Sequence, residues 1–261
     1  MTIQSTLYFS AFFALLAAAI YLYVGWRLGK RVVSSANARL AWQSFTVWWF
    51  GLAGTTLISG MLNMFGAWGL TNLPLYVTAT YINVLVLCVA LWGLLYYLVY
   101  LFTGNRSLLV PLAVFYFIFY TLLVYYVTAS APENIDVDRW RTALSYRAQL
   151  TGPFYTLLIF MLLLPQILGG LAYFFLYFQV TEATQKYRTL LVSWSIIIWF
   201  LSPFFALAGG LADEDWWQLV SRLIGLVAAL TILMAYLPPR WLQQRYGIVS
   251  LPDENRAEYI G

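Results

Sequence analysis

The chain has 261 residues, of which 62% are hydrophobic and 9% are charged, whereas about a quarter of the residues in an ordinary globular domain are charged. It contains one cysteine and no histidine. This composition excludes an intramolecular disulfide, the usual haem and zinc ligands, and the usual general base near neutral pH. We therefore expect an integral membrane protein that is not an enzyme and needs no cofactor.

Long apolar segments recur along the whole chain. They cover residues 5–28, 42–68, 74–102, 107–128, 153–178, 189–212 and 216–238, and each is long enough to cross about 30 Å of hydrocarbon as a helix. The sequence predicts an all-α fold, a seven-transmembrane helix bundle over residues 1–238, followed by a short tail over residues 239–261.

The Lys and Arg residues lie mainly on one side of these segments. Four fall on the side of the 129–152 connection, namely Arg139, Arg141, Arg147 and Arg222. Ten fall on the other side, namely Arg27, Lys30, Arg31, Arg39, Arg106, Lys186, Arg188, Arg240, Arg245 and Arg256. Because positive loops stay in the cytoplasm, this asymmetry predicts an outside N-terminus and a cytoplasmic C-terminus. The expected location is a prokaryotic inner or plasma membrane.

The apolar segments lack the residues of two familiar classes of membrane protein. Microbial rhodopsins carry the lysine that binds retinal in their seventh helix, but the segment 216–238 contains no lysine. Lys30 and Lys186 both lie in connections, so covalently bound retinal is excluded. No charged residue lies deep in any segment, and this disfavours ion-coupled transport, which needs charged groups inside the membrane.

Neutral polar residues are the candidates for ligand binding. Asn63 and Asn83 lie in the outer half of the second and third segments, while Gln166 and Ser202 lie near the middle of the fifth and sixth. An amide exposed to lipid is unfavourable, so these side chains should point inward. Together with Trp199 they form the predicted site for a neutral or apolar small molecule. Interhelical hydrogen bonding is the alternative role.

Two prolines fall in the middle of predicted helices. Pro165 and Pro203 each remove a backbone donor and free the carbonyl four residues earlier, at Met161 and Trp199. Each is followed within a few residues by a Gly-Gly pair. We predict that both are hinges between two states of the bundle. A static kink is the alternative.

The stretch "LLYYLVYLFTGNRSLLVP", from Leu94 to Pro111, is an aromatic-rich helix that ends in a short basic turn. It resembles the seven-helix sensory input region of bacterial and archaeal histidine kinases. The resemblance implies a sensor. In that family a coiled-coil, PAS or kinase module follows, whereas this chain stops at Gly261. We therefore expect a separate protein partner at the cytoplasmic face.

The tail begins with Pro238 and Pro239, which should end the last helix. A segment with Arg240, Trp241, Arg245 and Tyr246 follows. Its basic and aromatic side chains are expected to contact anionic lipid headgroups. Membrane lipids are thus expected partners, and nucleic acids are not.

Three functions stay open at this stage. The first is a receptor-like or sensor-like protein that binds a neutral or apolar small molecule or a lipid. The second is a facilitator for an uncharged solute, because Pro165-Gln166 resembles the Pro-Gln dipeptide of the sugar and vitamin facilitators with 3+1+3 helices. The third is a structural or assembly subunit of a membrane complex.

Overall fold

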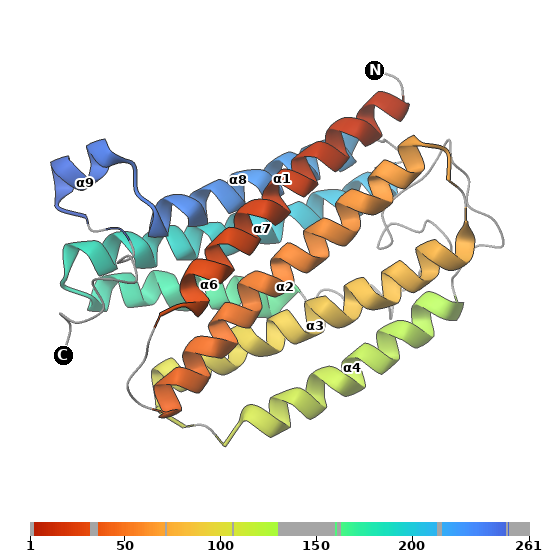
Figure 1. The fold of residues 1–261 in the computed structure, drawn as a ribbon. Helices are drawn as coiled ribbons and strands as arrows, with labels where there is room; N and C mark the ends of the chain where they lie inside the picture. Colours follow the sequence, from red (N-terminus) through yellow and green to blue (C-terminus); the bar gives the residue numbers. More distant parts are fainter. Residues whose placement is uncertain are drawn as a thin grey trace.

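The computed structural model describes residues 3–31, 36–70, 72–105, 107–129, 160, 163–212, 216–248 and 250. All regular secondary structure in this part of the chain is helical, in the order α1 Ile3–Gly29, α2 Ala36–Ala67, α3 Leu73–Thr103, α4 Leu109–Ala129, α6 Leu164–Gln179, α7 Ala183–Ala212, α8 Trp216–Tyr236 and α9 Arg240–Tyr246 (Figure 1). The predicted all-α class is therefore confirmed for the described residues.

In the described part of the chain, four helices are long and apolar enough to cross a membrane. They are Gln4–Gly29, Ala38–Ala67, Pro74–Thr103 and Trp216–Tyr236, and Leu109–Tyr125 adds a shorter apolar helix. This confirms a membrane-type protein, with four clear spans on length and composition. The short helix α9 lies in the tail and contains the basic and aromatic segment that follows Pro239.

The ends of α3 show how the sequence sets helix boundaries. The Asn72 side chain accepts a hydrogen bond from the backbone N–H of Leu75, and Pro74 occupies the first turn, where a missing N–H does no harm. Gly104 ends the helix with a φ of 66° and donates its N–H to the Tyr100 carbonyl. This left-handed conformation is readily adopted by glycine.

Six helices form a closed ring. Going round it, α2 packs against α1, α1 against α8, α8 against α7, α7 against α6, α6 against α3, and α3 back against α2. The contact between α3 and α6 is the weakest of the six. Helix α4 packs mainly on α3, at the outside of the ring (Figure 1).

Packing contacts fix the direction of each helix. Gly29 of α1 lies beside Thr46 of α2, and Gly93 of α3 lies beside the carbonyl of Ser44. The C-terminal ends of α1 and α3 therefore meet the N-terminal end of α2.

Helices α7 and α8, on the other side of the ring, can be oriented relative to α1 in the same way. Tyr21 of α1 donates a hydrogen bond to the Gly225 carbonyl of α8 at 3.3 Å, and Tyr187 of α7 donates one to the Met234 carbonyl of α8 at 3.1 Å. The start of α7 and the end of α8 thus belong to the end of the ring where α1 finishes.

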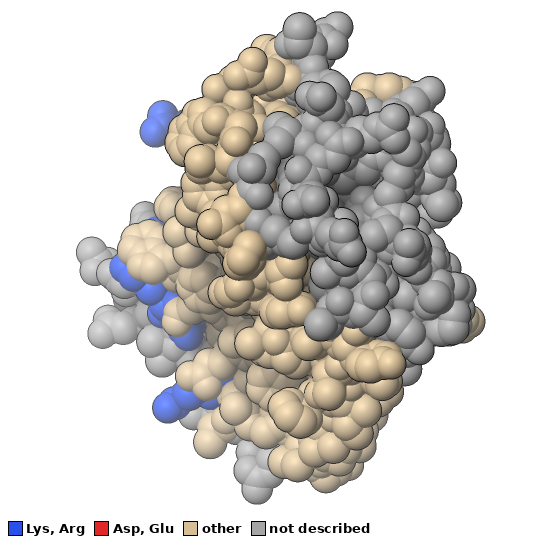
Figure 2. Space-filling view, turned by 90° about the vertical axis from the view of Figure 1, so that its right-hand side faces the viewer, with Lys and Arg blue, Asp and Glu red and all other residues tan. Residues whose placement is uncertain are grey.

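Eight of the described Lys and Arg residues gather at this end of the ring, which we call the basic end: Arg27, Lys30, Arg31, Arg39, Lys186, Arg188, Arg240 and Arg245. Arg222 is the only described Lys or Arg residue that does not lie at the basic end, and Glu182 is the only described acidic residue. Figure 2 views the opposite end of the ring, where blue side chains are visible only along the left edge and no red is visible. The described cations that the sequence assigns to the basic side therefore lie at one end of the ring, while Arg106, Arg139, Arg141, Arg147 and Arg256 lie outside the described residues.

Small residues bring the helices of the ring close together. A Cβ atom added to Gly93 would lie 2.5 Å from the Ser44 carbonyl oxygen, and one added to Gly60 would lie 3.2 Å from the Ala14 Cβ atom. Ala17 and Ala18 are also buried. The small residues of α1 are therefore helix contacts, as their spacing predicts.

The two prolines occupy different positions. Pro203 lies inside α7, as predicted. Pro165 lies in the first turn of α6, which follows π-helical residues at Phe160 and Leu163. Most of the predicted segment before Leu163, including Met161, lies outside the described residues.

Candidate functional site

Aromatic rings fill the interior of the helix ring. Phe45 and Trp48 of α2 lie near its centre, and the ring centroids of Trp48 and Trp199 of α7 are 5.9 Å apart. Phe45 stacks on Tyr97 of α3 at 4.6 Å and lies 6.0 Å from Tyr173 of α6. With two further members, Tyr21 and Trp49, which stack at 6.0 Å, these residues form what we call the central aromatic cluster.

Two donors inside this cluster have no acceptor among the described residues. Trp48 and Trp49 are both 0% exposed, and no described residue accepts a hydrogen bond from either Nε1 atom. A buried polar group without a partner costs about 1–3 kcal/mol, and nearly all such groups in proteins are satisfied. The cluster therefore presents two N–H groups that suit an acceptor oxygen or nitrogen on an otherwise apolar molecule.

The two predicted asparagines are buried, as expected. Asn63 of α2 is 1% exposed, and neither its Oδ1 nor its Nδ2 atom has a hydrogen-bond partner among the described residues. Asn83 of α3 is also buried, and its Oδ1 atom has none. Both residues lie in the half of the α2–α3 pair that is remote from the basic end. They add unpaired polar groups to that half of the bundle.

The other three predicted residues have different surroundings. Gln166 is buried in the first turns of α6. The Oγ atoms of Ser202 and Ser221 lie 3.2 Å apart, so Ser202 takes the alternative role of an interhelical hydrogen bond. Trp199 belongs to the central aromatic cluster.

The five predicted residues do not share one contact network. In the described part of the chain, no hydrogen bond or ring contact joins any two of Asn63, Asn83, Gln166, Ser202 and Trp199. Asn63 follows Trp48 by 15 residues on α2, which is about 22 Å of helix. The asparagines and the central aromatic cluster are therefore two separate regions.

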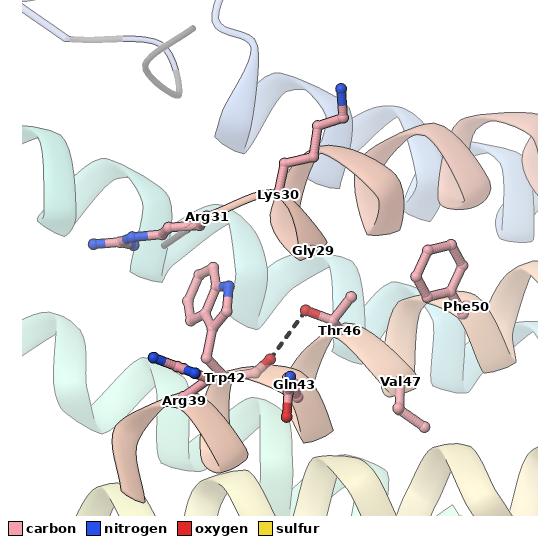
Figure 3. A pocket seen from close by; sticks show the side chains of 9 residues that line it. All are labelled: Gly29, Lys30, Arg31, Arg39, Trp42, Gln43, Thr46, Val47 and Phe50. Carbon is pink, nitrogen blue, oxygen red and sulfur yellow. Dashed lines mark hydrogen bonds between the residues drawn. The ribbon is translucent and has the colours of Figure 1, made fainter. Parts of the chain in front are cut away.

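A pocket at the basic end lies between α1 and α2 (Figure 3). It is an open cavity of about 560 Å³ lined by Gly29, Lys30, Arg31, Arg39, Trp42, Gln43, Thr46, Val47 and Phe50. This pocket could not be predicted from the sequence, because its lining comes from two helices whose pairing is not visible there. The sequence feature that pointed to this pocket was the Gly25/Gly29 pair, which is followed directly by Lys30 and Arg31.

Trp42 is the fixed element of this pocket. Its Nε1 atom donates to the Leu28 carbonyl at 2.8 Å, and Thr46 donates its hydroxyl hydrogen to the Trp42 carbonyl at 3.0 Å. The Arg31 guanidinium lies 4.8 Å from the centre of the Trp42 ring, in a cation–π contact. Lys30 lies over the Trp26 ring at 4.0 Å and points away from the other lining side chains in Figure 3.

Comparison of the chain with protein-family models, with curated proteins and with solved structures gives no match.

Proposed function

We propose that the protein is a seven-helix membrane receptor that binds an uncharged, largely apolar small molecule or lipid and has no catalytic activity. The four clear spans and the basic end support membrane insertion. Helices α4, α6 and α7 supply the three remaining spans. The basic end faces the cytoplasm of a prokaryotic cell, which leaves the N-terminus outside.

The central aromatic cluster carries this proposal. It joins the two sides of the ring through Trp48 and Trp199, and it contains the unpaired Nε1 donors of Trp48 and Trp49. A ligand with a carbonyl, ether or hydroxyl oxygen would accept hydrogen bonds from these donors. Its apolar part would pack on aromatic rings, which offer large contact areas.

Helix α7 is the moving part in this proposal. Pro203 has no N–H group, so α7 lacks the hydrogen bond to the carbonyl of Trp199. Trp199 is also the residue that contacts Trp48 across the ring. A change in the position of Trp199 would therefore act directly on the turn of α7 that lacks this hydrogen bond. The motion would reach the basic end, where a protein partner binds.

The receptor role is favoured over the facilitator role by the filled interior. A facilitator needs a path for its solute between the two membrane faces. In this conformation the centre of the ring is closed by the rings of Phe45, Trp48 and Trp199, all of which are buried. This arrangement suits a protein that responds to its ligand more than one that passes it on.

Native mass spectrometry of the protein purified gently from its membrane tests this proposal. The expected result is one small molecule per chain. In Trp48→Phe, which keeps a ring but loses the N–H group, the bound fraction should fall about tenfold, the effect of losing one buried hydrogen bond of about 1.4 kcal/mol. Trp26→Phe is the matched control, because Trp26 is exposed and outside the cluster.

Two results would contradict the proposal. One is an empty wild-type protein that instead carries a stoichiometric protein subunit, which would support the assembly role. The other is equal ligand occupancy in the wild type and Trp48→Phe, which would place the ligand away from the cluster.

A further inference from the structure

We propose that the pocket at the basic end binds one anionic glycerophospholipid, with the phosphate at Arg31 and Arg39 and an acyl chain against Val47 and Phe50. This inference rests on the membrane placement given under Proposed function, but it concerns a different site from the central aromatic cluster. The ligand differs as well, because it is charged.

The charged part of the pocket suits a phosphate. Arg31 and Arg39 line it, and guanidinium groups bind phosphate oxygens in pairs of hydrogen bonds. Glu182, the only described acidic residue, is not among the lining residues. Arg31 is also oriented by its contact with the Trp42 ring, so part of the entropy of ordering its side chain is already lost before a lipid binds.

The lining of the pocket changes from charged to apolar along α2. Arg39 comes first, Gln43 and Thr46 follow, and Val47 and Phe50 come last. Phe50 is 11 residues beyond Arg39, which corresponds to about 16 Å along the helix. A phospholipid changes in the same order, from its phosphate through the glycerol esters to the acyl chains. A free inorganic anion would use only the first part of this surface.

Gly29 makes room for the lipid on the α1 side. A Cβ atom added there would lie 3.4 Å from the Cγ2 atom of Thr46, an ordinary contact, and the backbone has no positive φ. A larger side chain at this position would therefore enter the pocket while the helix is retained. This gives a test that blocks the pocket without changing any charge.

The experiment uses the full chain in nanodiscs made from equal amounts of phosphatidylglycerol and phosphatidylcholine, released into detergent for native mass spectrometry. The wild type is expected to keep one phosphatidylglycerol per chain. Retention should fall about tenfold in Arg31→Gln/Arg39→Gln, by loss of charge-assisted hydrogen bonds. A similar fall is expected in Gly29→Leu, by filling of the pocket. Arg240→Gln/Arg245→Gln, which removes two exposed charges of the same end outside the pocket, should retain the lipid.

Three results would contradict the proposal that this pocket binds a phospholipid. Gly29→Leu could keep the lipid as well as the wild type does, or the Arg240→Gln/Arg245→Gln control could lose it equally, which would indicate general attraction to the basic end. Water-soluble glycerophosphoglycerol could displace the lipid at equal concentration, which would show a site for the headgroup anion alone. If Gly29→Leu does not fold, Gln43→Trp is the second filling variant, because Gln43 lines the pocket and is exposed.

The same experiment separates this inference from the proposed function. If the wild type does not enter nanodiscs, the membrane placement is wrong and the receptor proposal fails with it. If it enters nanodiscs and keeps no phosphatidylglycerol, only the lipid pocket is wrong.

Discussion

The two sides of the helix ring are held together in different ways. Helices α1, α2 and α3 meet at glycines, and a Cβ atom on Gly93 would lie 2.5 Å from the Ser44 carbonyl oxygen. Helices α6 and α7 also meet at a glycine, but a Cβ atom on Gly170 would lie 2.5 Å from the side chain of Ile197 and not from backbone. Serine hydroxyls join α6, α7 and α8 as well. Ser193 donates to the Gly170 carbonyl at 2.7 Å, and Ser195 donates to the Ala228 carbonyl at 2.9 Å.

This difference separates a fixed part from an adjustable part. Backbone contacts at glycine leave no side chain that could rotate to accommodate a shift. A serine hydroxyl can rotate towards another acceptor, and α7 also contains Pro203. We infer that α1, α2 and α3 are the scaffold and that α7 moves against them.

Gly93→Val should destabilise the protein most. The new side chain would collide with the backbone of α2 at Ser44, so α2 and α3 would have to separate. Overpacking of this kind costs about 3 kcal/mol. Thermal unfolding in detergent, followed by circular dichroism, measures the change. Gly29→Ala is the control and should be nearly neutral, because its Cβ atom makes only an ordinary contact. Equal stability of Gly93→Val and the wild type would refute the scaffold role of this interface.

Ser195→Ala should have an intermediate effect. It removes a hydrogen bond between α7 and α8, and such bonds in membrane proteins are worth about 1 kcal/mol. The same unfolding assay applies. Thr189→Ala is matched to it, because the Thr189 hydroxyl bonds only to Gln185 in its own helix at 2.8 Å. A larger loss in Thr189→Ala than in Ser195→Ala would show that the hydroxyls do not hold these helices together.

Phe117→Ala should have the smallest effect. Phe117 of α4 is 69% exposed, whereas its neighbour Tyr116 is 3% exposed. Because a lipid-facing ring gains little from its position, we expect a change within about 0.5 kcal/mol, and a clearly larger one for Tyr116→Ala. Comparable losses for the two variants would mean that α4 is not at the outside of the ring.

The helices could be predicted from the sequence, but the face of each helix that points inward could not. The apolar segments and Pro238-Pro239 predicted the end of α8, which finishes at Tyr236. Helices α1 to α4 are apolar on all sides, so they lack the polar stripe that marks the exposed face of a helix in a soluble protein. Burial of Asn63 and Asn83 could still be predicted, because amides avoid lipid.

The candidate sites depended on contacts that the sequence does not contain. The sequence analysis singled out Trp199, but its partner Trp48 emerged only from the packing of α2 against α7. The pocket at the basic end likewise needs Gly29 of α1 beside Thr46 of α2. Both sites are formed by pairs of helices, and single-helix periodicity carries no information about which helices pair.

The most direct test of the moving-helix account is a distance measurement between α2 and α7. Cys88 is the only cysteine, so Cys88→Ala provides a background for spin labels at Leu40 and Gln185, two exposed positions near the starts of these helices. Pulsed electron paramagnetic resonance in nanodiscs should show two distance populations, and Pro203→Ala should shift them towards one. Identical distance distributions in the two proteins would contradict the claim that α7 moves against α1, α2 and α3.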